Sequence, residues 1–250
     1  MGGTVYGIAG GKGGVGKTAT ALNVGVALAQ RGYRVALVDA DLSMTNLGQR
    51  VGLAHEPGIH DVLADEAAVS EALVEGPNGM AVLMGARDLE SYGKADPEKL
   101  REVLDLLRVP FDVVLVDTGP GVTSESHITH DVADGAIVVT TAGEVAVSDA
   151  ERTARFTERV DCPVTSLVVQ RIDDRAAAKR VGDRLDVDRW YGVPDHPEGH
   201  EQPAATAPAS GAATAYRRVA HDLPVGQPTD ETEPAEEAGV ADIDGDALAR

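Results

Sequence analysis

The sequence has few of the residues that disulfides, thiolate metal clusters or membrane spans require. Its 250 residues include one cysteine, Cys162, which excludes a disulfide within the chain and any cluster that needs several thiolates. Aromatic residues make up only 3% of the chain, so a core must be built from Val, Leu, Ile and Ala, as in buried parallel strands. No apolar run has the length of a membrane span, and no basic-then-apolar leader begins the chain. These features predict a cytoplasmic protein.

Positive charge is also scarce. Asp and Glu total 41 against 22 Lys and Arg, which gives a formal net charge of −19. Near 1 M salt the Debye length is only about 3 Å, so repulsion among surface carboxylates costs little there. The excess of acid therefore predicts a protein adapted to a salt-loving host.

Short β-branched runs alternate with longer helical segments, which predicts an α/β fold with a doubly wound, mostly parallel sheet and helices on both faces. The expected strands are 5–9, 34–39, 80–84, 112–117, 136–140, 164–169 and 190–193. The expected helices are 17–31, 97–107, 148–160, 175–185 and 212–221, with Asp96 as N-cap of the second and Ser148 as N-cap of the third. Residues 1–221 are expected to form one domain, and the acidic segment 222–250 a disordered tail.

One motif carries the chemistry, between the first expected strand and the first expected helix. It consists of Gly11, Lys12, Gly13, Gly14, Val15, Gly16, Lys17 and Thr18, in the context that a phosphate-binding P-loop requires. Glycines let backbone N–H groups converge on phosphate oxygens, and the helix N-terminus adds the positive end of its dipole. Lys17 would supply a charge to the terminal phosphates, and the Thr18 hydroxyl would be a Mg²⁺ ligand.

This loop, with the segments DADLSMTNL and VLVDTGPG, resembles the deviant-Walker-A ATPases of the ParA/MinD family over residues 5–221. The resemblance implies a P-loop NTPase fold and Mg²⁺-dependent ATP hydrolysis. It identifies Lys12 as the family's signature lysine, which contacts ATP across a homodimer that the nucleotide bridges. It also implies that Asp39 and Asp117 hold the Mg²⁺ water shell and that Asp41 orients the attacking water. Two carboxylates at i and i+2 just past a strand end agree with this division of roles.

The expected base contacts depart in part from the family pattern. Many relatives have Asn followed by Arg at the end of the sixth strand, where this sequence has Gln170 and Arg171. A longer amide can still make the same pair of hydrogen bonds to adenine. Pro194 and Asp195 resemble the family's other base-contacting loop, so all four residues are expected to contact the nucleotide.

Charge and side-chain spacing also bear on partners. The sequence has no Lys or Arg from Val219 through Ala249, which argues against a basic amphipathic helix and direct membrane binding. Basic residues between 171 and 189 are interleaved with Asp, which favours a solvated mixed-charge helix and leaves nucleic-acid binding open. The pairs His127/His130 and His196/His200 have metal-like spacing, but no third ligand is evident. Cys162 is expected in the core.

Three functions remain after these exclusions. The first is an ATP-driven dimerisation switch that hydrolyses ATP slowly and positions or partitions a cargo, such as a chromosome, a plasmid, or the division or motility machinery. It would act with an unidentified activating or cargo protein. The second is a nucleotide-binding regulator or scaffold in which hydrolysis is not essential. The third is a small-molecule ATP-dependent enzyme such as a cobyrinate-type synthetase, for which no second catalytic domain or nucleophile is present in the sequence. We expect the first.

Overall fold

The computed structural model describes residues 2–85, 93–195, 203–206 and 210–228. Within them the strands are β1 (Thr4–Ala9), β2 (Val35–Ala40), β3 (Leu73–Glu75), β4 (Ala81–Leu83), β5 (Val113–Thr118), β6 (Gly135–Thr141), β7 (Val164–Gln170) and β8 (Trp190–Val193). The α-helices are α1 (Lys17–Ala29), α2 (Leu47–Val51), α3 (Ile59–Leu63), α4 (Val69–Ala72), α6 (Leu100–Leu107), α7 (Ser124–Val132), α8 (Glu144–Arg159), α9 (Arg175–Leu185) and α10 (Gly211–Asp222). Short 3₁₀ turns are η1 (Pro77–Gly79), η2 (Pro97–Lys99) and η3 (Ala204–Thr206).

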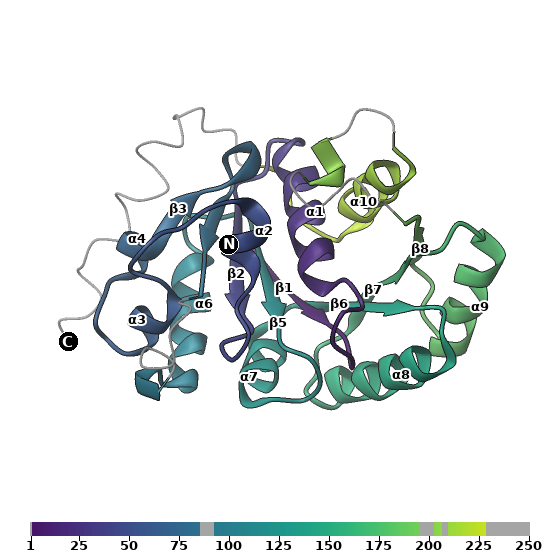
Figure 1. Ribbon diagram of the computed structural model, residues 1–250, viewed down its shortest axis with the longest axis horizontal. Coiled ribbons are helices and arrows are strands. Elements are labelled where there is room, and N and C mark those ends of the chain that lie inside the picture. Colours follow the sequence, from purple (N-terminus) through teal and green to yellow (C-terminus); the bar gives the residue numbers. More distant parts are fainter. Residues whose placement is uncertain (1, 86–92, 196–202, 207–209, 229–250) are drawn as a thin grey trace.

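The strands form one sheet with helices on both faces (Figure 1). Their order is β3-β4-β2-β5-β1-β6-β7-β8, and each neighbouring pair is parallel except β3 and β4. The expected fold class is confirmed. Because the carboxyl ends of parallel strands lie at the same edge of a sheet, the segments that follow β1, β2, β5 and β6 come together there.

Strand β2 shows how the sequence builds this sheet. All six of its residues are buried, as expected of a strand that has helices on both faces. Val35 and Leu37 pack into the core that includes α1 and α10, whereas Ala36 and Val38 pack into the core that includes α3, α6 and α7. This alternation follows from the two-residue period of a strand. A third cluster joins α8 and α9 to β6 and β7.

The expected elements are present, and the structure adds elements that were not expected, which are the helices α2, α3, α4 and α7 and the strand β3. The antiparallel edge strand β3 was not expected, because three residues are too few to give a periodic pattern. The capping role expected for Ser148 is wrong: α8 begins one turn earlier, with Gly143 as its N-cap. Ala146, Val147 and Ala150 are buried and continue one apolar face, so packing extends the helix toward β6. Asp96 does cap η2, where its side chain accepts the Glu98 N–H.

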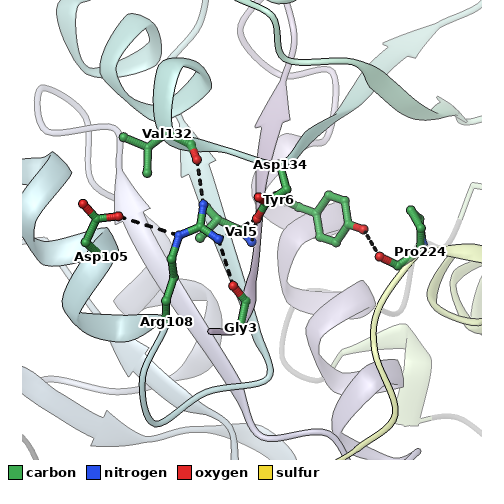
Figure 2. A network of polar contacts seen from close by, with 8 residues as sticks. All are labelled: Gly3, Val5, Tyr6, Asp105, Arg108, Val132, Asp134 and Pro224. Atoms are coloured by element: carbon green, nitrogen blue, oxygen red, sulfur yellow. Dashed lines mark hydrogen bonds and ion pairs between the residues drawn. The ribbon is translucent and has the colours of Figure 1, made fainter. Parts of the chain in front are cut away.

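Packing of the C-terminal segment continues beyond the expected domain boundary at residue 221. Leu223 is buried, the Pro224 carbonyl accepts the Tyr6 hydroxyl at 2.8 Å (Figure 2), and Val225 packs against the core. Ordered contacts therefore extend to Val225. The rest of the expected tail, from residue 229, lies outside the described residues.

Two other expectations concern residues away from the carboxyl edge of the sheet. Cys162 is buried in the core, which confirms its expected place. None of the helices in the described ranges combines the length and the apolar character needed to cross a bilayer.

Candidate functional site

The loop between β1 and α1 lies at the carboxyl edge, in the middle of the sheet (Figure 1). Gly14 and Gly16 have φ angles of 76° and 104°, which glycine adopts readily and other residues rarely do. A Cβ placed on Gly13 or Gly14 would meet no atom within 4 Å, so this part of the loop borders open space. Helix α1 starts at Lys17 with no side-chain cap, and its first backbone N–H groups are left for an anion.

Two cavities meet at this loop. The first cavity has a volume of about 340 Å³ and is lined by Lys17, Thr18, Asp41 and Arg50, among others. The second cavity has a volume of about 190 Å³ and contains all four expected base contacts, which are Gln170, Arg171, Pro194 and Asp195. The structure thus places Gly13, Gly14, Gly16, Lys17 and Thr18 at the first cavity and all four expected base contacts at the second, with Gly14 and Gly16 lining both. Of the other expected loop contacts, Val15 lines the second cavity, and Gly11 and Lys12 line neither of these two.

The two lysines of the motif differ in their surroundings. Lys17 is buried, and burial lowers the pKa of its ammonium group, while the charges of Asp117 and Asp41 act in the opposite direction. Lys12 is exposed and makes no hydrogen bond or ion pair with any residue in the described part of the chain. One cation therefore points into the cradle, and the other stands at its rim without an acidic partner.

Asp39 and Asp117, which the family resemblance assigns to one metal shell, are register partners on the neighbouring strands β2 and β5, and both are buried. The Asp39 carboxylate accepts the backbone N–H groups of Asp41, Asn46 and Leu47 at 3.2 to 3.3 Å. Asp117 Oδ1 has no hydrogen-bond partner, one of four buried side-chain polar atoms in this condition among the described residues. Burial raises the pKa of Asp39 to about 8 and that of Asp117 to about 6.

This set of oxygens fits Mg²⁺. A hydrogen bond from the Thr18 hydroxyl lowers the pKa of Asp117, as does the charge of Lys17, so the three side chains lie together. Mg²⁺ prefers hard oxygen ligands and is usually held by one or two carboxylates, water and substrate phosphates. The Oδ1 of Asp117 is an oxygen of this kind, and it accepts no hydrogen bond from any residue that the structure describes.

Asp41 lies where the loops after β2 and β5 meet. Its Oδ1 accepts the Ser43 hydroxyl and the Met44 backbone N–H, both at 3.2 Å. A Cβ on Gly119 would come within 3.2 Å of the same oxygen, so the two loops are in contact. Farther along, the Gly121 N–H donates to the Gly10 carbonyl at 3.3 Å. The loop after β5 thus contacts the loop after β2, at Asp41, and the residue after β1, Gly10.

Gln170 has contacts that its place in the motif did not predict. Its side chain is buried, and its amide nitrogen donates to the Thr20 hydroxyl at 2.7 Å and the Tyr216 hydroxyl at 2.9 Å. Both amide N–H bonds are therefore committed within the protein, where they join β7 to α1 and α10. Arg171 donates to the Gly14 carbonyl at 3.2 Å, which fastens the P-loop to the second cavity.

Three exposed apolar residues near the site were also missed. Met44, Val122 and Val145 are 72%, 62% and 65% exposed. Each follows the carboxyl end of a central strand, β2, β5 or β6, so all three lie on the same edge as the P-loop. For Met44 and Val122, a lone apolar residue in a polar loop was the signal in the sequence, whereas Val145 is in the first turn of α8 and had no such signal. We call these three residues the apolar rim.

The histidine pairs and the basic residues that the sequence analysis considered have structural contacts where they are described. His130 is buried between Phe156 and Cys162, and burial lowers its pKa to about 4. On α9, Lys179 pairs with Asp183 at 2.6 Å and Arg184 pairs with Glu144 and Glu151, the pattern of a mixed-charge helix. His196 and His200 lie outside the described residues.

Comparison with known proteins adds independent findings. The AAA domain family model matches residues 3–165. An uncharacterized ATP-binding protein of Methanocaldococcus jannaschii is 35% identical over 205 residues, which are 80% of this chain and 78% of that protein. The septum site-determining protein MinD of Bacillus subtilis is 33% identical over 235 residues, 86% of this chain and 87% of the relative. The solved structure of MinD from Pyrococcus horikoshii, complexed with Mg-ADP, aligns with a TM-score of 0.81 and 29% identity over 88% of this chain and 95% of that one.

Proposed function

The chain belongs to the ParA/MinD family of P-loop ATPases, and on that premise we propose that it is an ATP-driven dimerisation switch. It binds ATP with Mg²⁺, pairs with a second copy around the nucleotide, and hydrolyses ATP slowly. It acts from the cytoplasm through an activating or cargo protein. Because curated relatives are named for determining the septum site, part of the division machinery is the cargo we favour.

One observation carries this proposal: a complete phosphate cradle with an unpaired lysine at its rim. Lys17 fills the cradle from within, whereas Lys12 is exposed and has no acidic partner in the described part of its own chain. This is unexpected on a protein with a net charge of −19, where carboxylates are plentiful. A phosphate bound in a second copy is the acceptor that such a cation fits.

The other residues of the site have separate roles. The backbone of residues 11–16 and Lys17 hold the phosphates, and Thr18, Asp39 and Asp117 hold the Mg²⁺ shell. Bound Mg²⁺ supplies charge neutralisation on the phosphates. Asp41, at the mouth of the first cavity, orients water toward the terminal phosphate, as a carboxylate acceptor for its proton. Gln170, Arg171, Pro194 and Asp195 enclose the base.

The apolar rim supports pairing through this edge of the sheet. Met44 lines the first cavity, Val122 is in the loop after β5, and Val145 is in the first turn of α8, so the three exposed side chains come from three different segments at this edge. Burying one such side chain contributes about 1.5 to 3 kcal/mol, and exposed apolar groups that gather around a site are typical of an interaction surface. The same edge thus offers both an anion-seeking cation and apolar contact area.

The experiment is a measurement of oligomeric state by light scattering, in molar KCl with Mg²⁺, for the protein with ATP and with ADP. We expect a dimer with ATP and a monomer with ADP. Asp41→Ala should give a stable ATP dimer because the nucleotide is not hydrolysed, whereas Lys12→Ala should stay monomeric. Lys179→Ala is the matched control, because Lys179 is also exposed but is paired with Asp183 on α9.

Failure has two distinct forms. If wild type and all variants remain monomeric with ATP at every salt concentration, or if Lys12→Ala pairs as wild type does, the switch is wrong. ATP turnover then separates the remaining functions. Turnover that Lys17→Ala abolishes indicates an enzyme, and tight binding without turnover indicates a regulator or scaffold.

A further inference from the structure

Arg50, on the short helix α2, is placed between the two cavities of the site. The residues that line both cavities are Gly14, Gly16 and Arg50, so Arg50 is the one shared lining residue that has a side chain with hydrogen-bond donors. Every other lysine, arginine or amide side chain that lines these cavities lines only one of the two. A ligand that occupied both cavities would pass the Arg50 guanidinium.

The position of Arg50 is fixed by a chain of hydrogen bonds that starts at a buried carboxylate. Asp39 Oδ2 accepts the backbone N–H of Asn46 at 3.3 Å. The Asn46 side-chain oxygen, one helical turn before Arg50, accepts the Arg50 Nε–H at 3.3 Å. This contact uses the inner nitrogen of the guanidinium and leaves the two terminal nitrogens for another acceptor.

No acidic side chain neutralises Arg50 within the described part of the chain. The one side-chain hydrogen bond of its guanidinium within these residues goes to the neutral Asn46, whereas some other surface arginines pair with carboxylates, such as Arg101 with Asp131 and Arg184 with Glu144. In a chain with 41 acidic residues, a basic residue that lines a cavity without an acidic partner indicates that the cavity accepts an anion.

The charge of Arg50 reaches the second cavity. Burial is the main influence on Tyr216, which lines that cavity, and it raises the pKa of the hydroxyl, whereas the positive charge of Arg50 lowers it. Because Arg50 also lines the first cavity, it contributes positive potential at the junction of the two.

We propose that Arg50 binds the nucleotide in its own subunit through the phosphate nearest the ribose. A guanidinium offers a planar pair of N–H donors that matches phosphate oxygens, and charge-assisted contacts of this kind are the strong ones. The inference rests on the proposed function and deepens it, because it names a nucleotide-binding residue outside the P-loop motif. It also links the metal site to the grip on the nucleotide, since Asp39 and Arg50 share Asn46.

The test is calorimetric titration of the protein with Mg-ADP and with Mg-ATP, for wild type and Arg50→Gln. The phosphate nearest the ribose is common to both nucleotides, so Arg50→Gln should weaken both by a similar factor, about 10-fold. Arg50→Lys should recover part of the loss, because it keeps the charge without the fork. Asn46→Ala, which keeps Arg50 but removes its anchor, should weaken binding less than Arg50→Gln does.

The matched control is Arg180→Gln, because Arg180 is an exposed arginine on α9 that pairs with Asp174, and its loss should leave both affinities unchanged. Wild-type affinity in Arg50→Gln overturns the inference, and so does a loss confined to ATP, which would assign Arg50 to the terminal phosphate. Wild-type protein that binds neither nucleotide would instead overturn the proposed function. Melting of the nucleotide-free Arg50→Gln variant at the wild-type temperature shows that the fold is intact, because the side chain is exposed.

Discussion

The two ends of strand β5 carry the same chemical group in opposite conditions. At the amino end, Asp112 accepts the Arg34 backbone N–H at 2.8 Å and the Arg34 guanidinium at 3.2 Å. At the carboxyl end, Asp117 is buried with one oxygen that has no hydrogen-bond partner among the described residues, and burial raises its pKa to about 6. The carboxylate at the amino end is paired with a cation, whereas the one at the carboxyl end has an oxygen that can accept a ligand.

The same contrast holds for the cations of the two edges. At the amino edge, Arg108 donates to the carbonyls of Gly3 and Val132 and to Asp134, which also accepts the Val5 N–H (Figure 2). At the carboxyl edge, Lys12 and Arg50 have no acidic partner in the described part of the chain. One edge holds the fold together, and the other keeps charged groups available at a cost in stability, as sites that bind ligands commonly do.

The largest expected effect comes from replacing, one at a time, the carboxylates of Asp117 and Asp112 at the two ends of β5. Asp117→Asn should lower ATP turnover about 100-fold or more, because it removes a ligand for the metal shell. The same change should raise the unfolding free energy of the Mg²⁺-free protein by about 1 kcal/mol, since a buried, incompletely paired charge is lost. Turnover assays and denaturant unfolding without Mg²⁺ measure the two effects.

Asp112→Asn is the matched variant at the opposite end of the same strand. It weakens contacts to Arg34 and should lower the unfolding free energy, while turnover per folded molecule stays at the wild-type value. The contrast between the edges fails if the two variants shift stability in the same direction, or if Asp117→Asn retains both turnover and stabilisation by Mg-ATP.

A smaller effect is expected from Arg108→Met at the amino edge. The substitution keeps much of the apolar stem but leaves the Gly3 and Val132 carbonyls and Asp134 without their common donor. We expect a loss of about 2 kcal/mol of unfolding free energy and no change in turnover per folded molecule. Urea unfolding together with an active-site titration checks this, with Arg152→Met as a control because Arg152 is mostly exposed and, among the described residues, pairs only with Asp149. A fall in turnover without a loss of stability would show that the two edges are coupled.

The features that could be predicted from the sequence are those that local sequence patterns determine. The strands other than β3 and the P-loop follow from short apolar runs and from the glycine motif between the first strand and helix, whereas the shared role of Asp39 and Asp117 came from the family resemblance. Arg50 and the contacts of Gln170 could not be predicted, because they depend on where α2 and α10 pack, and those elements are distant in the sequence. Ser148 was misplaced for the same reason: its capping signal is local, and the apolar face of α8 outweighs it.

The smallest effect concerns the contact that fastens the C-terminal segment to β1. Tyr6→Phe keeps the buried ring but removes the hydroxyl that donates to the Pro224 carbonyl, so one hydrogen bond is lost and the cavity is still filled. We expect a loss of about 1 kcal/mol in urea unfolding, with no change in turnover. Tyr33→Phe is the control, since Tyr33 is also buried but its hydroxyl has no hydrogen bond within the described residues, and its removal should be neutral. Equal losses of unfolding free energy in the two variants would mean that the Tyr6 hydroxyl does not hold the segment after α10. They would also mean that the amino edge contributes less to the stability of the ordered domain than the contacts of Arg108 indicate.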